Sequence, residues 1–259
     1  MDLLIGTFVL RPYVFGFLAA YLVAGARDLG WRRTLLFGAW VGPLAWFSEF
    51  LSTRIGIPFG LYHYTGDTRG QELFIANVPF MDCLSFTFLA YASFCLARGA
   101  LRSRRPSPMG VALASGVLMM LLDVVIDPIA VRGDQWFLGR IFYYAEEGVY
   151  FGVPLSNFAG WLLVGVLSVG GYLWWESRLS PGLGLTGGDD DAKDHYGRQC
   201  GPGIALYYAV LGFNLAVTGW IGEWLLLAIG VVVHVVTVVI LWNVGLRPAT
   251  RLGLEKQRA

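Results

Sequence analysis

Long blocks of apolar residues are the feature that most limits how this chain can fold. Each block is long enough to cross a lipid bilayer as a helix, which takes about 20 residues. Only 14% of the 259 residues are charged, whereas soluble domains carry nearer to about 25%. The pattern predicts an all-α fold, a polytopic membrane bundle of about seven transmembrane helices. These helices are expected at about residues 4–26, 33–52, 79–97, 109–127, 152–175, 203–221 and 224–245.

The first apolar block resembles a signal peptide in one respect. Ala24-Gly25-Ala26 has the small residues of a signal-peptidase site. The block has no basic start, however, and Arg11-Pro12 interrupts its apolar run. We therefore expect a retained first helix.

The basic residues predict the orientation in the membrane. Fourteen of the nineteen Lys and Arg residues fall in loops 27–32, 98–108 and 176–202, the flanking helix ends and the C-terminal tail 246–259. By the positive-inside rule this side is cytoplasmic. We expect a bacterial-type inner membrane protein with its N-terminus outside and its C-terminus in the cytoplasm. Residues 1–259 are expected to form one integral membrane domain, with the core motifs at 40–175.

The charge and the scattered cysteines and histidines limit the partners. A net charge of +1 argues against nucleic acid. The three cysteines show no paired spacing, so no disulfide framework or zinc site is expected. The three histidines are equally scattered, and no metal site is expected.

Two aromatic loops on the predicted outer side, 53–78 and 128–151, are unusual. Aromatic belts at the membrane interface explain single Tyr and Trp residues better than they explain two dense clusters. Each loop leads into a similar helix start, "VPFMD" at 78–82 and "VPLSN" at 153–157. The order of helix, acid, aromatic loop and Val-Pro helix start therefore occurs twice, which indicates a parallel internal repeat. Because the match is short, chance similarity is the alternative.

Five polar side chains fall at one depth, near the outer helix ends. They are Glu49, Asp82, Asp123, Asp127 and Asn157. Asp123 and Asp127 share a helix face, because residues four apart do. Acidic residues within membrane spans are costly and usually face an interior cavity, so we expect a shared cavity here. For Asp127 alone, the alternative is a surface residue at a chain reversal caused by Pro128.

Other polar features have simpler interpretations. The run "DDDAKD" at 189–194 matches the magnesium-diphosphate motif of prenyltransferases, but it follows a glycine-rich linker and is typical of a solvated loop. His234 and Asn214 lie in mid-span, where hydrogen bonds between helices are expected. Glu223 is a candidate for the outer acid layer. Arg11 is expected to extend outward or to pair with an outer acid.

Carboxyl and aromatic side chains around a cavity suit acid chemistry on an apolar substrate. Burial disfavours the ionised form of a carboxyl group, so that it keeps its proton near neutral pH and can act as a general acid. Protonation of a trisubstituted alkene gives a tertiary carbocation, which carboxylates and aromatic faces stabilise. Water then adds in a hydration, whereas a second double bond attacks in a cyclisation.

Three motifs carry a resemblance to a known family. They are "EFLSTRIGIPFGLYHYT" at 49–65, "DVVIDPIAV" at 123–131 with Trp136 after it, and "YFGVPLSNFAGW" at 150–161. Over about residues 40–175 the chain resembles the carotenoid biosynthesis membrane family that contains the end-group hydratases acting on γ-carotene and bisanhydrobacterioruberin. In the first motif Pro-Phe-Gly-x-Tyr-x-Tyr is the best anchor.

The resemblance implies addition of water across the terminal double bond of an acyclic (ψ) carotenoid end group, with no cofactor. Asp123, Asp127 and Glu49 would be the catalytic residues. By the motifs, Tyr62, Tyr64, Trp136, Asn157 and Trp161 would bind the substrate, and we add Phe59 and Asp82 as further substrate-binding candidates. Asp82 departs from the family pattern, in which this position is usually apolar. The implied partners are lycopene, γ-carotene or a related polyene, the lipid bilayer and other carotenoid biosynthesis enzymes.

Asp123 is the expected proton donor because it lies deeper and drier than Asp127. Asp127 or Glu49 would then hold the water and stabilise the cation. A lycopene-type cyclase, a membrane prenyltransferase that uses 189–194, and a non-catalytic carotenoid-binding or scaffold protein are the alternatives.

Overall fold

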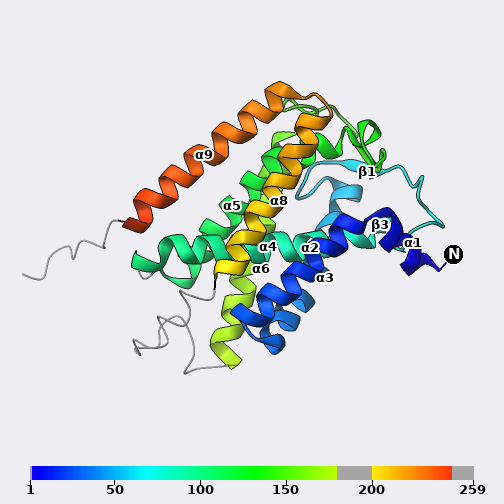
Figure 1. The fold of residues 1–259 in the computed structure, drawn as a ribbon. Coiled ribbons are helices and arrows are strands. Elements are labelled where there is room, and N and C mark those ends of the chain that lie inside the picture. Colours follow the sequence, from blue (N-terminus) through cyan, green and yellow to red (C-terminus); the bar gives the residue numbers. More distant parts are fainter. Residues whose placement is uncertain (1, 105, 180–199, 247–259) are drawn as a thin grey trace, which may run out of the picture.

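Long helices dominate the structure (Figure 1). The computed structural model describes residues 2–104, 106–179 and 200–246. The helices are α1 (Leu3–Leu10), α2 (Pro12–Asp28), α3 (Trp31–Ile55), α4 (Phe80–Leu101), α5 (Pro108–Ala130), α6 (Leu155–Leu179), α8 (Gly201–Trp220) and α9 (Trp224–Leu246). The short elements are η1 (Arg102–Arg104), η2 (Gly133–Gln135), β1 (Tyr62–Tyr64), β2 (Phe74–Ile75), β3 (Val78–Pro79) and β4 (Phe142–Tyr144).

The predicted polytopic helical bundle is confirmed, but its first helix differs from the prediction. Six helices, α3 to α6, α8 and α9, are long and apolar enough to cross a membrane. One continuous helix over 4–26 is wrong, because α1 and α2 meet at an angle of 92°. Arg11 at the bend has non-helical backbone angles, φ −128° and ψ 48°. Pro12 is the first residue of α2. The first N–H groups of a helix have no partner within it, so the missing N–H of proline costs no hydrogen bond at this position.

The end of α5 also differs from the prediction. The sequence predicts a helix that ends at Asp127, yet α5 continues through Pro128 to Ala130. Because proline has no N–H, the carbonyl of Val124 loses its partner within the helix. The Tyr150 hydroxyl donates to that carbonyl at 3.3 Å. Asp127 therefore lies inside the last turns of α5 and not at a chain reversal.

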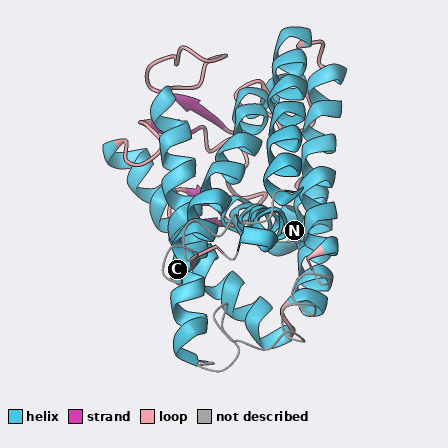
Figure 2. Ribbon diagram, turned by 90° about the vertical axis from the view of Figure 1, so that its left-hand side faces the viewer, coloured by secondary structure: helices cyan, strands magenta, loops and turns pink. Residues whose placement is uncertain are grey.

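Helix α4 crosses the middle of the bundle (Figure 1), and buried residues occur all round it. The turned view looks close to along its axis, with other helices on either side (Figure 2). Helices α2, α3, α5, α6 and α8 all pack against it. A helix that is apolar on every face is typical of the core of a large or membrane-embedded protein.

Helices α5 and α6 pack closely through two glycines. A Cβ atom added to Gly116 would lie 2.7 Å from the carbonyl oxygen of Leu162. A Cβ atom added to Gly165 would lie 2.8 Å from the Cα atom of Gly116. Small residues let helix backbones approach in membranes, where close packing replaces the hydrophobic effect as the source of stability.

The two aromatic loops meet at one end of the bundle, as the predicted topology requires (Figure 1). Strand β1 pairs antiparallel with β4, and His63 lies opposite Tyr143. Arg132 in the second loop pairs with Glu223 in the turn between α8 and α9, at 2.5 Å. We call this end, which holds residues 56–79, 131–154 and 221–223, the loop end.

The order of elements repeats along the chain. Helix α3, strand β1 and helix α4 follow one another as α5, β4 and α6 do. Val78-Pro79 precedes α4, and Val153-Pro154 precedes α6. Each unit consists of a helix, a strand and a second helix. Strands β1 and β4 pair antiparallel about His63 and Tyr143, which is the pairing that a two-fold axis between the two units would produce. The order agrees with the predicted parallel repeat, which stays a prediction.

The glycine contact between α5 and α6 gives a first prediction. Gly165→Ala places a methyl group where α5 leaves no room, and overpacking of this kind costs about 1–3 kcal/mol. Gly170→Ala on the same helix is the matched control, because its Cβ would lie 3.6 Å from Ala112, an ordinary contact. We expect Gly165→Ala to lower the thermal unfolding midpoint of the detergent-solubilised protein, and Gly170→Ala to leave it unchanged or raised. Equal midpoints would contradict the close packing.

Candidate active site

A cavity of about 140 Å³ lies among the helices near the loop end. Nine of the ten predicted site residues line it: Glu49, Phe59, Tyr62, Tyr64, Asp82, Asp127, Trp136, Asn157 and Trp161. The tenth, Asp123, is fully buried and is not part of the lining. The structure therefore brings the predicted residues together from α3, α4, α5, α6 and both aromatic loops. Their chemical roles stay predictions.

Asp123 lies one turn before Asp127 on α5, where α5 packs against α6. Asn157 on α6 donates from Nδ2 to Oδ2 of Asp123 at 2.6 Å. The carboxyl groups of Asp123 and Asp127 also interact directly. Oδ1 of Asp123 has no hydrogen-bond donor among the described residues. One proton shared by the two carboxyl groups would supply that missing donor.

Tyrosines from the paired strands reach the carboxyl groups on the loop side. Tyr144 on β4 donates to Oδ2 of Asp127 at 3.2 Å. Tyr62 on β1 donates to Oε2 of Glu49. Tyr64, two residues along β1, lies 2.7 Å from the same Glu49 oxygen and 2.6 Å from Oδ2 of Asp82. Alternation along a strand places Tyr62 and Tyr64 on one face, toward the cavity.

The two contacts of Tyr64 set a minimum number of protons on Glu49 and Asp82. Burial, followed by the charges of Asp82 and Glu49, raises the pKa of Tyr64 well above its usual value, so the phenol stays protonated. Its single proton can be donated to only one of the two carboxyl groups. The other carboxyl group must then be protonated and donate to the Tyr64 oxygen. The Glu49–Asp82 pair therefore holds at least one acid proton in this arrangement.

Burial likewise raises the pKa of Tyr144 above its usual value, and the charges of Asp127 and Asp123 add to the effect. This phenol also remains a hydrogen-bond donor. Sequence reasoning missed Tyr144, although it lies within the aromatic run "IFYY" at 141–144. The signal that could have found it is its place in the second loop, which matches the place of Tyr64 in the first.

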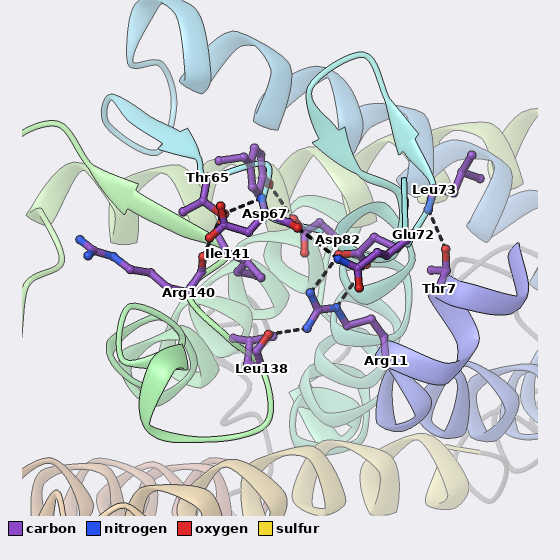
Figure 3. A network of polar contacts seen from close by, with 12 residues as sticks. Thr7, Arg11, Thr65, Asp67, Glu72, Leu73, Asp82, Leu138, Arg140 and Ile141 are labelled. Atoms are coloured by element: carbon purple, nitrogen blue, oxygen red, sulfur yellow. Dashed lines mark hydrogen bonds and ion pairs between the residues drawn. The ribbon is translucent and has the colours of Figure 1, made fainter. Parts of the chain in front are cut away.

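Arg11, which the sequence predicts to extend outward or to pair with an outer acid, forms a buried ion pair in the structure. Its Nη2 atom lies 2.9 Å from Oε1 of Glu72, and both side chains are almost fully buried. Its Nη1 atom donates to the carbonyl of Leu138 at 2.6 Å. Figure 3 shows this network beside Asp82. The bend between α1 and α2 is thus tied to both aromatic loops. Glu72, a partner that sequence analysis missed, decides between the two expectations for Arg11.

No ion pair within the described part of the chain includes Glu49, Asp82, Asp123 or Asp127. Four ionised carboxylates out of water and near one another would repel strongly. The set can approach neutrality by holding protons or by facing a cation of the substrate. This property suits acid catalysis through a carbocation.

Aromatic rings form the remaining walls. Tyr62 packs edge-on against Tyr64, Phe142 and Tyr144, with centroids 5.5 to 5.8 Å apart. Phe86 stacks on Trp161 at 4.4 Å. Aromatic faces carry partial negative charge and attract cations.

Two other sequence expectations are resolved by the structure, and a third is not tested. Asn214 bonds to the Val210 carbonyl and His234 to the Gly230 carbonyl, each within its own helix, so the expected bonds between helices are wrong. Asn214 instead lines the cavity, a position that sequence reasoning missed. Glu223 pairs with Arg132 and is not among the lining residues. The acidic run 189–194 lies outside the described residues.

The fold and the cavity define a polytopic membrane protein with an acidic, aromatic-lined site. The chain belongs to the carotenoid biosynthesis protein family, whose model matches residues 3–237. It is 31% identical over 166 residues to the bisanhydrobacterioruberin hydratase of Haloarcula japonica. That similarity covers 64% of this chain and 51% of the relative, so the chain spans about half the length of the relative. No solved structure matches the chain.

The buried Arg11–Glu72 pair gives a second prediction. Glu72→Gln leaves the Arg11 charge without its counterion in a site excluded from water, and breaking such a pair costs about 3–5 kcal/mol. Glu223→Gln is the matched control, because the Arg132–Glu223 pair is partly exposed, at 22% and 27%, and such pairs contribute about 1 kcal/mol or less. We expect a much larger fall in thermal stability for Glu72→Gln. A similar fall in both variants would contradict the role assigned to the buried pair.

Proposed function

We propose that this protein is a carotenoid hydratase that adds water to the terminal double bond of an acyclic (ψ) end group and uses no cofactor. The observation that carries the proposal is the cavity lined by Asp127, Glu49 and Asp82 together with aromatic rings. Family membership and the similarity to a named carotenoid hydratase support a carotenoid as the substrate class. The substrate would be lycopene, γ-carotene or a related polyene.

Asp127 is the proton donor in this proposal. The sequence favoured Asp123 for its depth, but Asp123 does not line the cavity whereas Asp127 does. The Asp127 proton passes to the less substituted alkene carbon, and the π electrons form the new C–H bond. The other alkene carbon becomes a tertiary cation. Asp123 shares its proton with Asp127 from behind and so supports the return of the donor to its acid form.

Glu49 is the base that activates water. Tyr62 and Tyr64 both bond its Oε2 atom, which leaves Oε1 for a water molecule. The water oxygen attacks the tertiary cation, and its proton passes to Glu49. The product is a tertiary alcohol, one water heavier than the substrate. Transfer of this proton back toward Asp127 completes the cycle with no net change in the protein.

The size of the cavity favours hydration over cyclisation. A cavity of about 150 Å³ accommodates a molecule the size of benzene, and this one is about 140 Å³. One terminal isoprene unit is of comparable size. A cyclase must hold two isoprene units folded onto each other, which needs more room. The lycopene-type cyclase therefore remains the second candidate, and the mass of the product separates the two.

We propose the predicted orientation together with the function. The loop end would face the outside of the inner membrane, because the basic loops lie at the other helix ends. The reacting end of the polyene would then lie near the outer membrane surface. Other enzymes of carotenoid biosynthesis are the partners that would supply the substrate and consume the alcohol.

Product mass tests the proposed reaction. We expect expression of the chain in a bacterium that accumulates lycopene, or in one that makes γ-carotene, to yield a pigment heavier by one water. Chromatography and mass spectrometry of pigment extracts measure this. A product of unchanged mass and shifted absorbance would support cyclisation instead. Pigment that binds the protein without chemical change would support the carotenoid-binding interpretation, and a requirement for magnesium and a diphosphate donor the prenyltransferase.

Substitution of the carboxyl groups tests the roles. Asp127→Asn removes the transferable proton, and loss of a general acid typically lowers the rate by about 100- to 10,000-fold. Asp123→Asn is expected to have a smaller effect, because Asp127 keeps its contact with the cavity. Asp134→Asn is the matched control, since this exposed aspartate lies shortly after α5, in η2, and does not line the cavity. Product formed per amount of membrane-inserted protein is the measure, and wild-type activity of Asp127→Asn would exclude it as donor.

A further inference from the structure

The cavity is far too small to hold the whole of a carotenoid. Its volume of about 140 Å³ suits an end group, whereas the polyene is a rod about as long as the hydrocarbon core of a bilayer is thick, about 30 Å. Most of the substrate must therefore lie outside the cavity while its end reacts. The protein needs a passage through which a rigid apolar chain can leave.

Most walls of the cavity are closed. Phe86, Phe88 and Leu89 on α4 are 3 to 4% exposed, and Trp161 on α6 is 6% exposed. Phe59 and Val210, at 2% exposure, are equally enclosed. The Phe86–Trp161 stack seals the gap between α4 and α6. The passage therefore does not run through the α4–α6 side.

Half-buried aromatic residues line the cavity between α2 and α8. We call Tyr13, Phe17 and Phe213 the aromatic seam; all three line the cavity and all three are partly exposed. Phe213 stacks on Tyr13 at 5.3 Å and meets Phe17 edge-on at 5.6 Å. At this level the two helices meet through these aromatic rings, and the Tyr13–Phe213 contact is face to face. Flat conjugated chains pack favourably against such faces.

The seam begins beside the loop end, where Tyr13 contacts Trp136 and Phe137, and continues one turn along α2 to Phe17. The lining on α4 runs from Asp82 to Leu89, a distance of about 10 Å along a helix. Phe213 lies within α8, seven residues before its end at Trp220. The carboxyl groups and Tyr13 thus lie at the loop end of the cavity, and Phe17 and Phe213 lie deeper in the bundle. An end group at the carboxyl groups would direct its polyene toward the seam.

A second apolar groove competes as a place for the polyene. It has a volume of about 540 Å³ between α2, α3 and α4, and Leu35, Leu84 and Cys83 are among its lining residues. Helix α4 separates this groove from the carboxyl groups. Cys83 and Leu84 line the groove, whereas Asp82 and Ser85 line the cavity. A polyene in the groove would have no direct path to Asp127.

We propose that the polyene of the bound substrate leaves the cavity between α2 and α8, through the aromatic seam of Tyr13, Phe17 and Phe213. This inference rests on the proposed function, which supplies the identity of the substrate. Phe213 is the side chain that must turn aside, because it contacts both aromatic partners on α2. The seam thereby selects substrates whose end group continues as a straight, unsaturated chain.

Photo-crosslinking tests the path without relying on turnover. The photoreactive residue p-benzoylphenylalanine replaces Phe17, Phe213 or, as the control in the competing groove, Leu35. The full chain in phosphatidylcholine vesicles is irradiated with lycopene, and intact-protein mass spectrometry detects the adduct. We expect labelling at position 17 or 213 at least about ten times that at 35, the ratio that a preference of about 1.4 kcal/mol gives. Two seam positions guard against the failure of one variant to fold.

Labelling at position 35 alone, or equal labelling at all three positions, would overturn the seam. Hydrated product with no adduct at position 17 or 213 would also overturn it and leave the proposed function intact. Selective seam labelling without any new pigment would have the opposite meaning. The seam would then stand as a polyene-binding site, and hydration would fail.

Discussion

Four carboxyl groups at one end of a membrane bundle, none of them in an ion pair within the described chain, are the constraint on which this structure depends. Ionised together in a medium of low dielectric constant, they would destabilise the fold. Phenol donors, and protons held by the carboxyl groups themselves, lower that cost. Tyr64 bridges Glu49 and Asp82, and Tyr144 bonds Asp127. The same arrangement that permits the acids to be buried leaves them with protons to give and with room for a cation.

Three separate contacts hold this arrangement in place. The close packing of α5 and α6 at Gly116 and Gly165 holds Asp123 against Asn157. The β1–β4 pair brings tyrosines from two loops, about 80 residues apart in the chain, to the same cavity. The buried Arg11–Glu72 pair anchors both loops to the bend between α1 and α2. Arg11 satisfies Glu72 and so remains unavailable to the four acids, which is why a buried arginine close to the site does not neutralise it.

Much of the site could be predicted because ionisable side chains within a membrane span cost free energy and therefore stand out in the sequence. Asp123 and Asp127 within an apolar span have few explanations other than an internal cavity, and their spacing of four fixes a shared face. The sequence could not rank them by access, because access depends on how α6 covers the helix. It also could not predict the bend at Arg11 or its partner Glu72. That pair joins segments 61 residues apart through loop geometry, for which periodicity gives no signal.

The two units of the predicted repeat differ at one position of the shared Val-Pro motif, where one has a carboxyl group and the other an amide. At the position where the first unit has Asp82, the second has Asn157 in the matching Val-Pro motif. The amide of Asn157 is a permanent donor to Oδ2 of Asp123, which keeps that oxygen an acceptor and leaves Oδ1 as the oxygen that can share a proton with Asp127. Asp82 can donate to Tyr64 only while it is itself protonated, and Glu49 accepts from two phenols. In the proposed reaction, the side with Asp127 would present a proton and the side with Glu49 would receive one. Addition of water to an alkene needs this division between acid and base, and a duplicated helix pair can supply it through a change from carboxyl to amide.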